Sequence, residues 1–333
     1  MNQPLCCVSC NFKLPEGRKF KLCPDCGFPV RTLKTRYQFR ASLKRGRVGQ
    51  LYRVWDSEAS EDKVVKVMRS DLFKDATQAA RFWREIRVTR QLSQRSPHIV
   101  RLLDHGEDEH FGRYYVMEYL EGQTLRDRLH ASEPHSLVEI FTIVRQICEA
   151  LEVAHNHGFL HRDLSPSNIF LDQQGPSSPW VKLLDFGMAK ALEGTAHKGL
   201  TQGMVGTPAY TPPEQWQAHR VDERSDLYAL GAVLYELLTL SPPFVTEGSS
   251  LRDLMTLMHL HSTTTPESLA ERRPDLHYPL ELNNIVQKLL AKEPTNRYAS
   301  AQELWTALAP YARMKGEVSP PPNPVFAEDR TLW

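Results

Sequence analysis

The sequence predicts an α+β fold in which a small cysteine-bearing unit precedes a β-rich part and a mainly helical part. Five of the six cysteines lie within the first 26 residues, which separates that segment from the rest. Residues 37 to about 110 contain short β-rich segments and one helical stretch, whereas helical periodicity dominates from Thr124 onward. A chain of 333 residues has room for two domains and short extensions.

The composition excludes several classes of protein. Hydrophobic residues make up 41% and charged residues 24%, which is typical of a globular chain and excludes complete disorder. The most apolar stretch, residues 227–244, contains Glu236 and two prolines, so we expect no membrane span. The N-terminus lacks the basic and then apolar order of a secretory signal, and we therefore expect a cytoplasmic protein.

Charge is unevenly distributed along the chain, although the net charge is only +1. Residues 1–50 contain 11 Lys and Arg against two acidic residues, and the remainder is correspondingly acidic. This basic head could bind a protein or a nucleic-acid partner, or it could lie against the acidic body of its own chain. The sequence leaves both alternatives open.

The β-rich part is predicted from three segments and one helix. Strands are expected over Tyr37–Leu43, Gly49–Asp56 and Lys63–Met68, where β-branched and aromatic residues alternate with polar ones. A helix is expected over Asp75–Leu92, with Asp75 as its N-cap.

The helical part begins its longest predicted helix at Ser136. The run Ser136-Leu137-Val138-Glu139 has the spacing of a capping box, and apolar residues then recur at helical intervals up to Gly158. The same spacing recurs at Ser300–Glu303 before the last helix. Residues 316–333, which contain Ser-Pro-Pro-Pro, are expected to form a flexible tail.

The N-terminal cysteines form two C-x-x-C pairs separated by 12 residues. Two such turns can direct four thiolates at one point, which is the closed tetrahedral arrangement of a structural zinc site. A segment this short cannot bury enough apolar surface to fold alone, so a metal is physically needed. A disulfide pair or unligated thiols are the alternatives. The expected zinc ligands are Cys7, Cys10, Cys23 and Cys26.

Chemistry is suggested first by Lys66. Strand alternation places it between Val64 and Met68 on one face, where a buried ammonium needs an anion. Glu85, in the predicted helix, is a possible partner. Upstream, Gly46-Arg47-Val48-Gly49 forms a turn whose backbone could approach phosphate oxygens, although most two-glycine turns are simple hairpins.

A more specific signal lies downstream. His161-Arg162-Asp163-Leu164-Ser165-Pro166-Ser167-Asn168 is followed at a short interval by Leu184-Asp185-Phe186-Gly187. Two carboxylates and an amide on adjacent loops form an oxygen-rich site that suits Mg²⁺, an ion that keeps substrate phosphates among its ligands.

These segments together resemble the signature of the eukaryotic-type (Hanks-type) protein kinases. The family's motifs occur in the family's order: the glycine turn, the strand lysine, the helix glutamate, HRD-x-x-x-x-N, DFG and a PPE triplet. The residues around these motifs are most similar to those of bacterial Ser/Thr kinases. The resemblance implies a bilobal kinase domain over residues 37–310, with lobes of about 37–120 and 121–310. The zinc-ribbon-like module would occupy residues 1–34, and a flexible tail residues 311–333.

The resemblance also implies roles for individual residues. Asp163 would accept the proton of the substrate hydroxyl, Asn168 and Asp185 would hold Mg²⁺ or Mn²⁺, and Lys66, held by Glu85, would bind the α- and β-phosphates of ATP. Further structural roles fall to Asp226 and to the ion pair of Glu214 with Arg297. The remaining expected nucleotide-binding residues are Leu43, Gly46, Val48, Gly49, Leu51, Val64, Met117, Glu118 and Leu120.

The chain departs from the family pattern at three positions. Lys44 occupies the first glycine position of the loop, Ser165 stands where Ser/Thr kinases usually have a lysine, and Pro212 replaces an alanine. Loss of one transition-state contact commonly costs about 10²–10³ in rate, so Ser165 bears on the rate of catalysis. The catalytic residues themselves are retained.

The expected activity is therefore transfer of the γ-phosphoryl group of ATP to Ser and Thr hydroxyls of proteins. The expected autophosphorylation sites are Thr201 and Thr195. A pseudokinase scaffold is the main alternative, and a small-molecule phosphotransferase is a further one. The sequence does not indicate the protein substrates, the activating signal, the role of the four-cysteine module or the oligomeric state.

Overall fold

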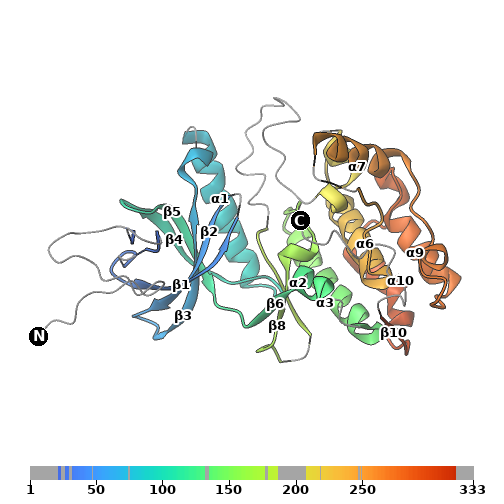
Figure 1. Ribbon diagram of the computed structural model, residues 1–333, viewed down its shortest axis with the longest axis horizontal. Helices are drawn as coiled ribbons and strands as arrows, with labels where there is room; N and C mark the ends of the chain where they lie inside the picture. Colours follow the sequence, from blue (N-terminus) through green and yellow to red (C-terminus); the bar gives the residue numbers. More distant parts are fainter. Residues whose placement is uncertain are drawn as a thin grey trace, which may run out of the picture. The chain divides into compact units, whose positions relative to one another are not determined.

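The structure, a computed structural model, describes residues 22–23, 27–29, 32–46, 48–73, 76–131, 135–176, 179–186, 208–217, 219–246, 248 and 250–319. The chain divides into two compact units. Unit 1 comprises Met1–Ser93 and Val100–Leu120, and unit 2 comprises Gln94–Ile99 and Glu121–Trp333. Many of the strands and helices carry labels in Figure 1.

Unit 1 is built on a five-stranded sheet with the order β1-β2-β3-β5-β4, in which every neighbouring pair is antiparallel. The strand predicted over Gly49–Asp56 has the predicted bounds, whereas its two neighbours are each longer by two residues at one end, because the hairpin ladders continue beyond the apolar residues. The elements are β1 (Tyr37–Arg45), β2 (Gly49–Asp56), β3 (Glu61–Met68), η1 (Ser70–Leu72), α1 (Ala76–Ser93), β4 (Leu102–Asp108) and β5 (Gly112–Glu118).

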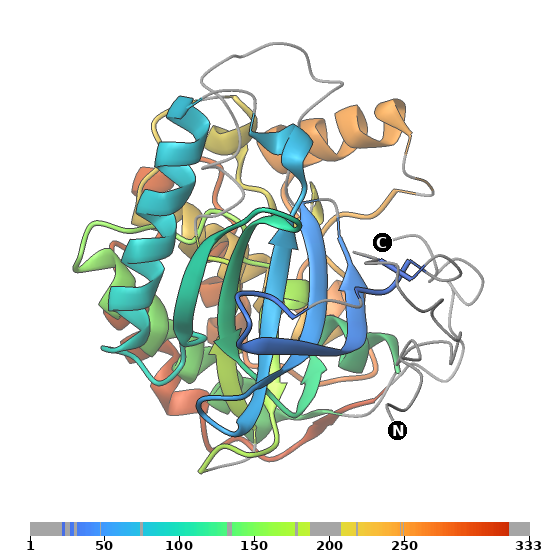
Figure 2. The same cartoon turned by 90° about the vertical axis from the view of Figure 1, so that its left-hand side faces the viewer.

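Helix α1 runs alongside the sheet (Figure 2). Phe82 is fully buried, and its ring lies 6.3 Å from that of Tyr115 on β5. Trp83 makes a second ring contact, 5.3 Å from His105 on β4. These aromatic contacts fix the helix to the sheet. The predicted N-cap Asp75 lies outside the described residues.

The segment before β1 packs on the opposite face of the sheet. Cys23, Phe28 and Leu33 are buried in one apolar cluster with side chains of β1, β2, β3 and β5, and the Phe28 ring lies 6.1 Å from Tyr52. Strand alternation places Val65, a member of this cluster, on the other face from Lys66. The described part of the basic head thus lies against its own chain.

A tight turn at Leu33–Arg36 reverses the chain into β1. The Arg36 N–H donates to Leu33 O at 3.1 Å, and the two central residues, Lys34 and Thr35, both have positive φ (50° and 58°). That is the backbone of a type I′ turn, which non-glycine residues adopt at a cost. The buried side chain of Leu33 offsets that cost.

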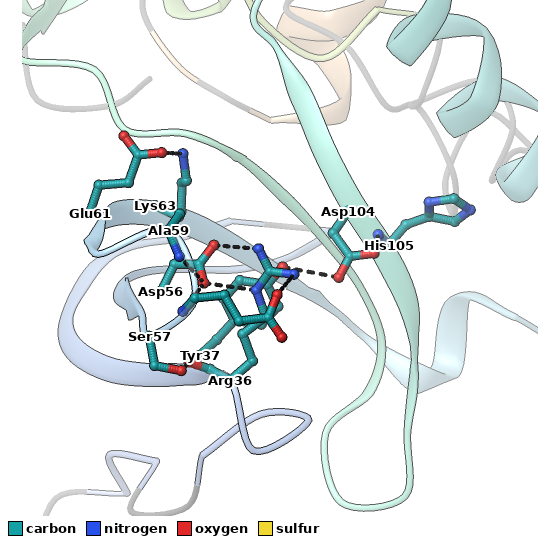
Figure 3. A network of polar contacts seen from close by, with 10 residues as sticks. Arg36, Tyr37, Asp56, Ser57, Ala59, Glu61, Lys63, Asp104 and His105 are labelled. Carbon is teal, nitrogen blue, oxygen red and sulfur yellow. Dashed lines mark hydrogen bonds and ion pairs between the residues drawn. The ribbon is translucent and has the colours of Figure 1, made fainter.

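An ion pair fastens the same turn to the sheet. Arg36 donates to both carboxylate oxygens of Asp56 at 2.7 Å, and Tyr37 OH donates to Asp104 at 3.0 Å (Figure 3). The hydrogen bonds from Arg36 hold the pKa of Asp56 below its ordinary value. Two basic residues of the head are therefore engaged within unit 1, since Lys34 also lies over the Tyr114 ring at 5.4 Å.

Unit 2 is mainly helical and contains two small sheets. One sheet has the order β6-β8-β9, and the other pairs β10 with β7. The strands are β6 (Gly122–Thr124), β7 (His135–Ser136), β8 (Ile169–Asp172), β9 (Trp180–Leu183) and β10 (Glu317–Val318). The helices are α2 (Leu125–His130), α3 (Leu137–His155), η2 (Pro166–Asn168), η3 (Pro208–Tyr210), α5 (Pro213–Trp216), α6 (Glu223–Thr239), α7 (Leu251–Thr263), α8 (Leu269–Arg272), α9 (Leu280–Leu289), η4 (Pro294–Asn296), α10 (Ala301–Leu308) and η5 (Ala309–Tyr311).

Helices α3 and α6 form the core of unit 2. The apolar face of α3 is buried, and α6 is buried along almost its whole length. At the start of α3 the Ser136 side chain accepts the Glu139 N–H at 3.1 Å, whereas the Glu139 carboxylate pairs with Arg128. Only the Ser136 half of the predicted capping box is thus formed. Among the described residues, none of the helices combines the length and apolar character that a bilayer crossing requires.

The end of the described chain differs from the predicted flexible tail. Glu317 and Val318 form β10, paired with β7, and Val318 is fully buried. The expectation of a flexible tail is therefore wrong for residues 316–319. The proline-rich composition of this segment predicted flexibility, and a single valine before it was too weak a signal to predict a buried strand.

Candidate active site

The loop between α3 and β8 carries the predicted catalytic residues of unit 2. Asn168, at the end of η2, donates through Nδ2 to Asp163 O at 2.8 Å and to Asp163 Oδ2 at 3.0 Å. The Asn168 N–H donates in turn to Ser165 O at 2.9 Å. The structure thus brings Asp163 and Asn168 together and fixes the orientation of the Asp163 carboxylate.

Asp226, in the first turn of α6, binds the backbone of this loop. Its two oxygens accept the backbone N–H groups of His161 and Arg162, each at 2.8 Å, and one of them also contacts His155 Nε2 at 2.8 Å. Burial works to raise the pKa of Asp226, but the hydrogen bond from His155 and the others hold it below its ordinary value. Asp226 is therefore an anionic acceptor for a loop whose residue Arg162 has a positive φ of 65°.

Asp185 follows β9 in a left-handed conformation, with φ at 54°. Strand β9 pairs with β8, and the Leu184 N–H donates to Asn168 O at 2.9 Å. This bond ties the chain that leads into Asp185 to the loop that carries Asn168. The neighbouring Phe186 is buried, and its ring lies 4.6 Å from that of His161. Burial lowers the pKa of His161, which is consistent with a neutral ring that accepts the Asp163 N–H through Nδ1.

Glu214 and Arg297 form a buried ion pair. Arg297 donates to the two Glu214 oxygens at 2.7 and 2.9 Å, and Ser225 Oγ donates to the same carboxylate at 2.6 Å. Arg297 also donates to three backbone carbonyls, those of Ala291, Lys292 and Arg224. Although burial opposes it, the Arg297 hydrogen bonds keep the pKa of Glu214 below its ordinary value.

A small pocket lies beside Asp163. Its lining includes Arg162, Tyr210, Pro212 and Gln215. Gln215 donates to Arg162 O at 3.2 Å, so α5 also supports the loop. Pro212, which replaces the family's alanine, is the N-cap of α5 and occupies that position with extended backbone.

Unit 1 carries the residues predicted to bind nucleotide phosphates. Lys66 is only 6% exposed, and its register partners are Leu51 on β2 and Tyr115 on β5. Its ammonium lies 5.7 Å from the centre of the Tyr115 ring, the same ring that Phe82 of α1 approaches. Glu85, half-buried on α1, follows Phe82 by three residues and thus lies on the same face of the helix.

The glycine turn closes the β1–β2 hairpin. The Gly46 N–H donates to Gly49 O at 2.9 Å, and Val48 O accepts the Arg69 N–H at 3.0 Å. A Cβ on Gly49 would lie 2.4 Å from Val67 O, so β3 approaches too closely for any side chain there. Before the turn, Leu43 is 47% exposed and Lys44 is also exposed.

The predicted adenine-binding residues Met117 and Glu118 end β5, and Leu120 follows it. Val64 and Met117 are register partners on neighbouring strands. The Glu118 N–H donates to Arg101 O at 3.0 Å, and its carboxylate accepts the Arg101 N–H at 2.9 Å. The Glu118 N–H is thus engaged within unit 1, and Leu120 lies half-buried at the end of this segment.

Of the four predicted zinc ligands, only Cys23 is described. It is 3% exposed, its N–H donates to Phe28 O at 2.7 Å, and its carbonyl accepts the Gly27 N–H at 2.9 Å. Gly27 has a φ of 71°. Cys7, Cys10, Cys26, Thr195 and Thr201 lie outside the described residues. Within the described residues there is no cluster of three potential metal ligands.

Sequence reasoning missed several residues that position the site. His155 is the last residue of α3 and contacts Asp226, and Gln146 on the same helix bonds to Pro179 O and the Val181 N–H at the start of β9. Tyr210 donates to Glu236 at 2.5 Å, and Arg126 donates to Glu236 at 2.9 Å. The detectable signal was a polar residue within an otherwise apolar helix, as at Gln146 and Glu236.

Comparison with known proteins agrees with this geometry. A family model described as protein kinase domain matches residues 37–307. Serine/threonine-protein kinase PknB of Mycolicibacterium smegmatis is 37% identical over 276 residues, covering 82% of this chain and 42% of that protein. Serine/threonine-protein kinase pkn3 of Myxococcus xanthus is 34% identical over 275 residues, covering 82% and 49% respectively. The chain thus spans less than half the length of these curated relatives.

A solved structure shares the fold. The crystal structure of the Mycobacterium tuberculosis PknI kinase domain has a TM-score of 0.61 and 26% sequence identity. The similarity covers 83% of this chain and 95% of that chain. The strand-rich unit 1 and the helical unit 2 are therefore the N-terminal and C-terminal lobes of that fold.

Proposed function

The chain belongs to the protein kinase family, and on this premise we propose that it transfers the γ-phosphoryl group of ATP to Ser and Thr hydroxyls of proteins. The observation that carries the proposal is the arrangement of Asp163, whose carboxylate is oriented by Asn168 on a loop fixed by Asp226. A carboxylate held in this way can accept a proton from a hydroxyl. The curated relatives support Ser/Thr rather than Tyr as the acceptor.

In the proposed reaction, Asp163 orients the acceptor hydroxyl and takes its proton as the hydroxyl oxygen bonds to the γ-phosphorus. The bond between that phosphorus and the bridging oxygen breaks, and ADP leaves. His161 holds the Asp163 backbone through its neutral ring, so the loop geometry does not depend on its protonation at ordinary pH. Asp163 is thus the proposed catalytic base.

The donor set fits a divalent cation. Because Asn168 uses Nδ2 for Asp163, its Oδ1 is the atom that can ligate a cation, and Asp185 would add a carboxylate. Few protein oxygens and a share of substrate phosphate are what Mg²⁺ or Mn²⁺ takes. When bound, such an ion neutralises negative charge on the phosphates of ATP.

We assign ATP binding in unit 1 to the face of the sheet that carries Lys66. Lys66 would contact the α- and β-phosphates with Glu85 as its partner, and Gly46 and Gly49 would cover the phosphates. Because the Glu118 N–H is bound to Arg101, only the carbonyl of Glu118 is proposed to accept from adenine, with Leu120 offering its backbone. Leu43, Val48, Leu51, Val64 and Met117 would line the base and sugar.

A phosphorylation assay tests the proposal. Wild-type protein, Asp163→Asn and Lys66→Met are incubated with radiolabelled ATP, Mg²⁺ and a protein substrate. The expected loss in each variant is about 10²-fold or more, because a general base or a phosphate contact is removed. Equal labelling by all three proteins would overturn the proposal.

We further propose that the kinase phosphorylates itself at Thr201 and Thr195. Both residues lie in the sequence between Asp185 and the PPE triplet, and the resemblance to the kinases implies that Arg162, beside Asp163, would contact a phosphate there. Mass spectrometry of active protein is expected to find phosphate on Thr201 first. Active protein with neither threonine modified would contradict this.

We propose a structural zinc ion at Cys7, Cys10, Cys23 and Cys26. The turn that follows Cys23, closed by the Gly27 N–H, supports it, as does the buried position of Cys23. Elemental analysis of the full chain is expected to give one zinc per protein, and Cys23→Ser is expected to lose it. Thiol titration that finds a disulfide and no metal would contradict the proposal.

The basic head, residues 1–50, is proposed to contact its own chain. Since Arg36 and Lys34 are engaged within unit 1, we propose that the head binds mainly its own lobe. Retention of the full chain on DNA or RNA that weakens with salt would instead indicate a nucleic-acid partner. A cytoplasmic location stays a prediction that fractionation tests.

A further inference from the structure

The chain after the last helix of the kinase domain folds back onto unit 2. The family model ends at residue 307, yet residues 312–319 are described, and Glu317–Val318 pair antiparallel with His135–Ser136. Val318 is opposite His135, and both side chains are fully buried. We name residues 316–319 the C-terminal clasp.

The clasp supplies a missing acceptor to helix α3. Leu137 is the first residue of α3, and the first N–H groups of a helix have no partner inside it. Ser136 Oγ accepts the Glu139 N–H, while Gly316 O accepts the Leu137 N–H at 3.0 Å. The helix is therefore capped from two sources, its own N-cap residue and a segment about 180 residues later in the chain.

The clasp is held at both ends. At Gly316 the backbone has a φ of 151°, and a Cβ there would lie 3.0 Å from Leu137 Cδ1. At the other end Arg273, only 3% exposed, donates to Ser319 O at 2.7 Å while its guanidinium also pairs with Asp275. The site thus favours a small residue at position 316 and an exposed residue at 317. It favours a buried branched side chain at 318, and it binds the backbone carbonyl of residue 319.

We propose that β7 is a strand-addition site for an extended peptide segment, and that its occupant is the chain's own clasp. The edge of β7 supplies the pairing, the buried position of Val318 opposite His135 gives selectivity, and Arg273 binds the carbonyl of Ser319. An added strand that gains affinity from main-chain bonds and specificity from alternate side chains is a known mode of peptide recognition. The proposal requires that a peptide of the same sequence can replace the clasp.

Hydrogen exchange of the full chain tests this independently of kinase activity. Val318→Asp places a charge at a buried position and is expected to raise exchange of the Leu137 amide by about tenfold or more, since a buried side chain and a hydrogen bond are lost. Glu317→Gln is the matched control, because Glu317 is exposed and the amide retains an acceptor for Ser319 Oγ. Amides of α9 report whether the variant remains folded.

A synthetic peptide of residues 313–320 is then added to the Val318→Asp protein. The native peptide is expected to restore protection of the Leu137 amide. The same peptide with Val318→Asp is expected to leave that amide unprotected. If Val318→Asp does not fold, the milder Gly316→Val, whose side chain meets Leu137, takes its place. Unchanged exchange at Leu137 in a folded variant, or no rescue by saturating native peptide, would overturn the proposal.

Discussion

Asp226 Oδ2 lies 2.8 Å from the backbone nitrogen of His161. The other oxygen of the same carboxylate is 2.8 Å from the backbone nitrogen of Arg162. One buried side chain of α6 thus fixes the backbone of the two residues that directly precede Asp163.

Asp226→Asn is expected to reduce both stability and the phosphoryl-transfer rate. The amide offers one acceptor where the carboxylate offered two, and each N–H left without a partner costs about 1–3 kcal/mol. Urea unfolding and the phosphorylation assay measure the two effects. Asp222→Asn, at the N-cap of the same helix, is the control because asparagine caps equally well. Equal behaviour of the two variants would contradict the assigned role.

Glu214→Gln is expected to destabilise the chain by about 3–5 kcal/mol, because it leaves the buried Arg297 without its counter-charge. A double variant that also carries Arg297→Met is expected to lose less than the sum of the two single losses. Denaturant unfolding of the four proteins gives the coupling energy. Glu223→Gln, an exposed residue of α6, serves as the control, and additive losses would indicate no coupling.

His261 is expected to stay uncharged across the physiological pH range. Burial on α7 lowers its pKa to about 3, and its Nδ1 is 2.8 Å from Tyr228 OH. The unfolded chain binds a proton near pH 6.5 and the folded chain does not, so this residue's contribution to stability falls as pH drops from about 6.5 toward 3. In His261→Gln that part of the pH dependence should disappear. NMR that shows the folded ring titrating near pH 6.5 would contradict the assignment.

Phe28→Ala is expected to cost about 3–5 kcal/mol of stability, the usual range for removing a buried phenylalanine. Phe28 is 4% exposed and packs against Tyr52 at the sheet. Leu22→Ala is the control, because Leu22 is 42% exposed. Thermal unfolding compares them, and a Phe28 variant as stable as the control would mean that the segment does not pack on unit 1.

Gly49→Ala is expected to weaken the β1–β2 hairpin by about 1–3 kcal/mol through overpacking against Val67. Its affinity for ATP should fall with the distorted turn. Among the described residues, a Cβ at Gly46 would meet Gly49 O at 3.5 Å, an ordinary contact, so Gly46→Ala is the matched variant and should leave the stability of the hairpin nearly unchanged. Calorimetry with ATP and Mg²⁺ measures both, and a neutral Gly49→Ala would show that the hairpin can adjust.

Much of the fold and the motif residues could be predicted because local patterns carry them. Strand alternation around Val64–Met68 and the helical repeat after Ser136 extend over enough residues to be unambiguous. Asp163 and Asn168 lie only five residues apart, so one loop can carry both, and the order of the motifs indicated that they share a site. The kinase family itself was identified correctly from the order of the motifs.

Contacts between distant segments could not be predicted in this way. Nothing near His155 indicates that it meets Asp226, 71 residues later. The side chains of Phe28 and Val318 likewise find their partners only in the folded chain, because burial depends on surfaces that no local pattern specifies. The four-cysteine zinc site and the phosphorylated threonines stay predictions.

The contact of Phe28 and Leu33 with the sheet bears on how this chain can be shortened. The kinase family model begins at Tyr37, directly after the turn that brings both side chains onto β1 and β2. A fragment cut at that boundary would present the aromatic rings of Phe39 and Tyr52 to water, next to the exposed backbone of an edge strand. Such a fragment should self-associate, and the kinase domain should therefore be produced with residues 1–36 attached.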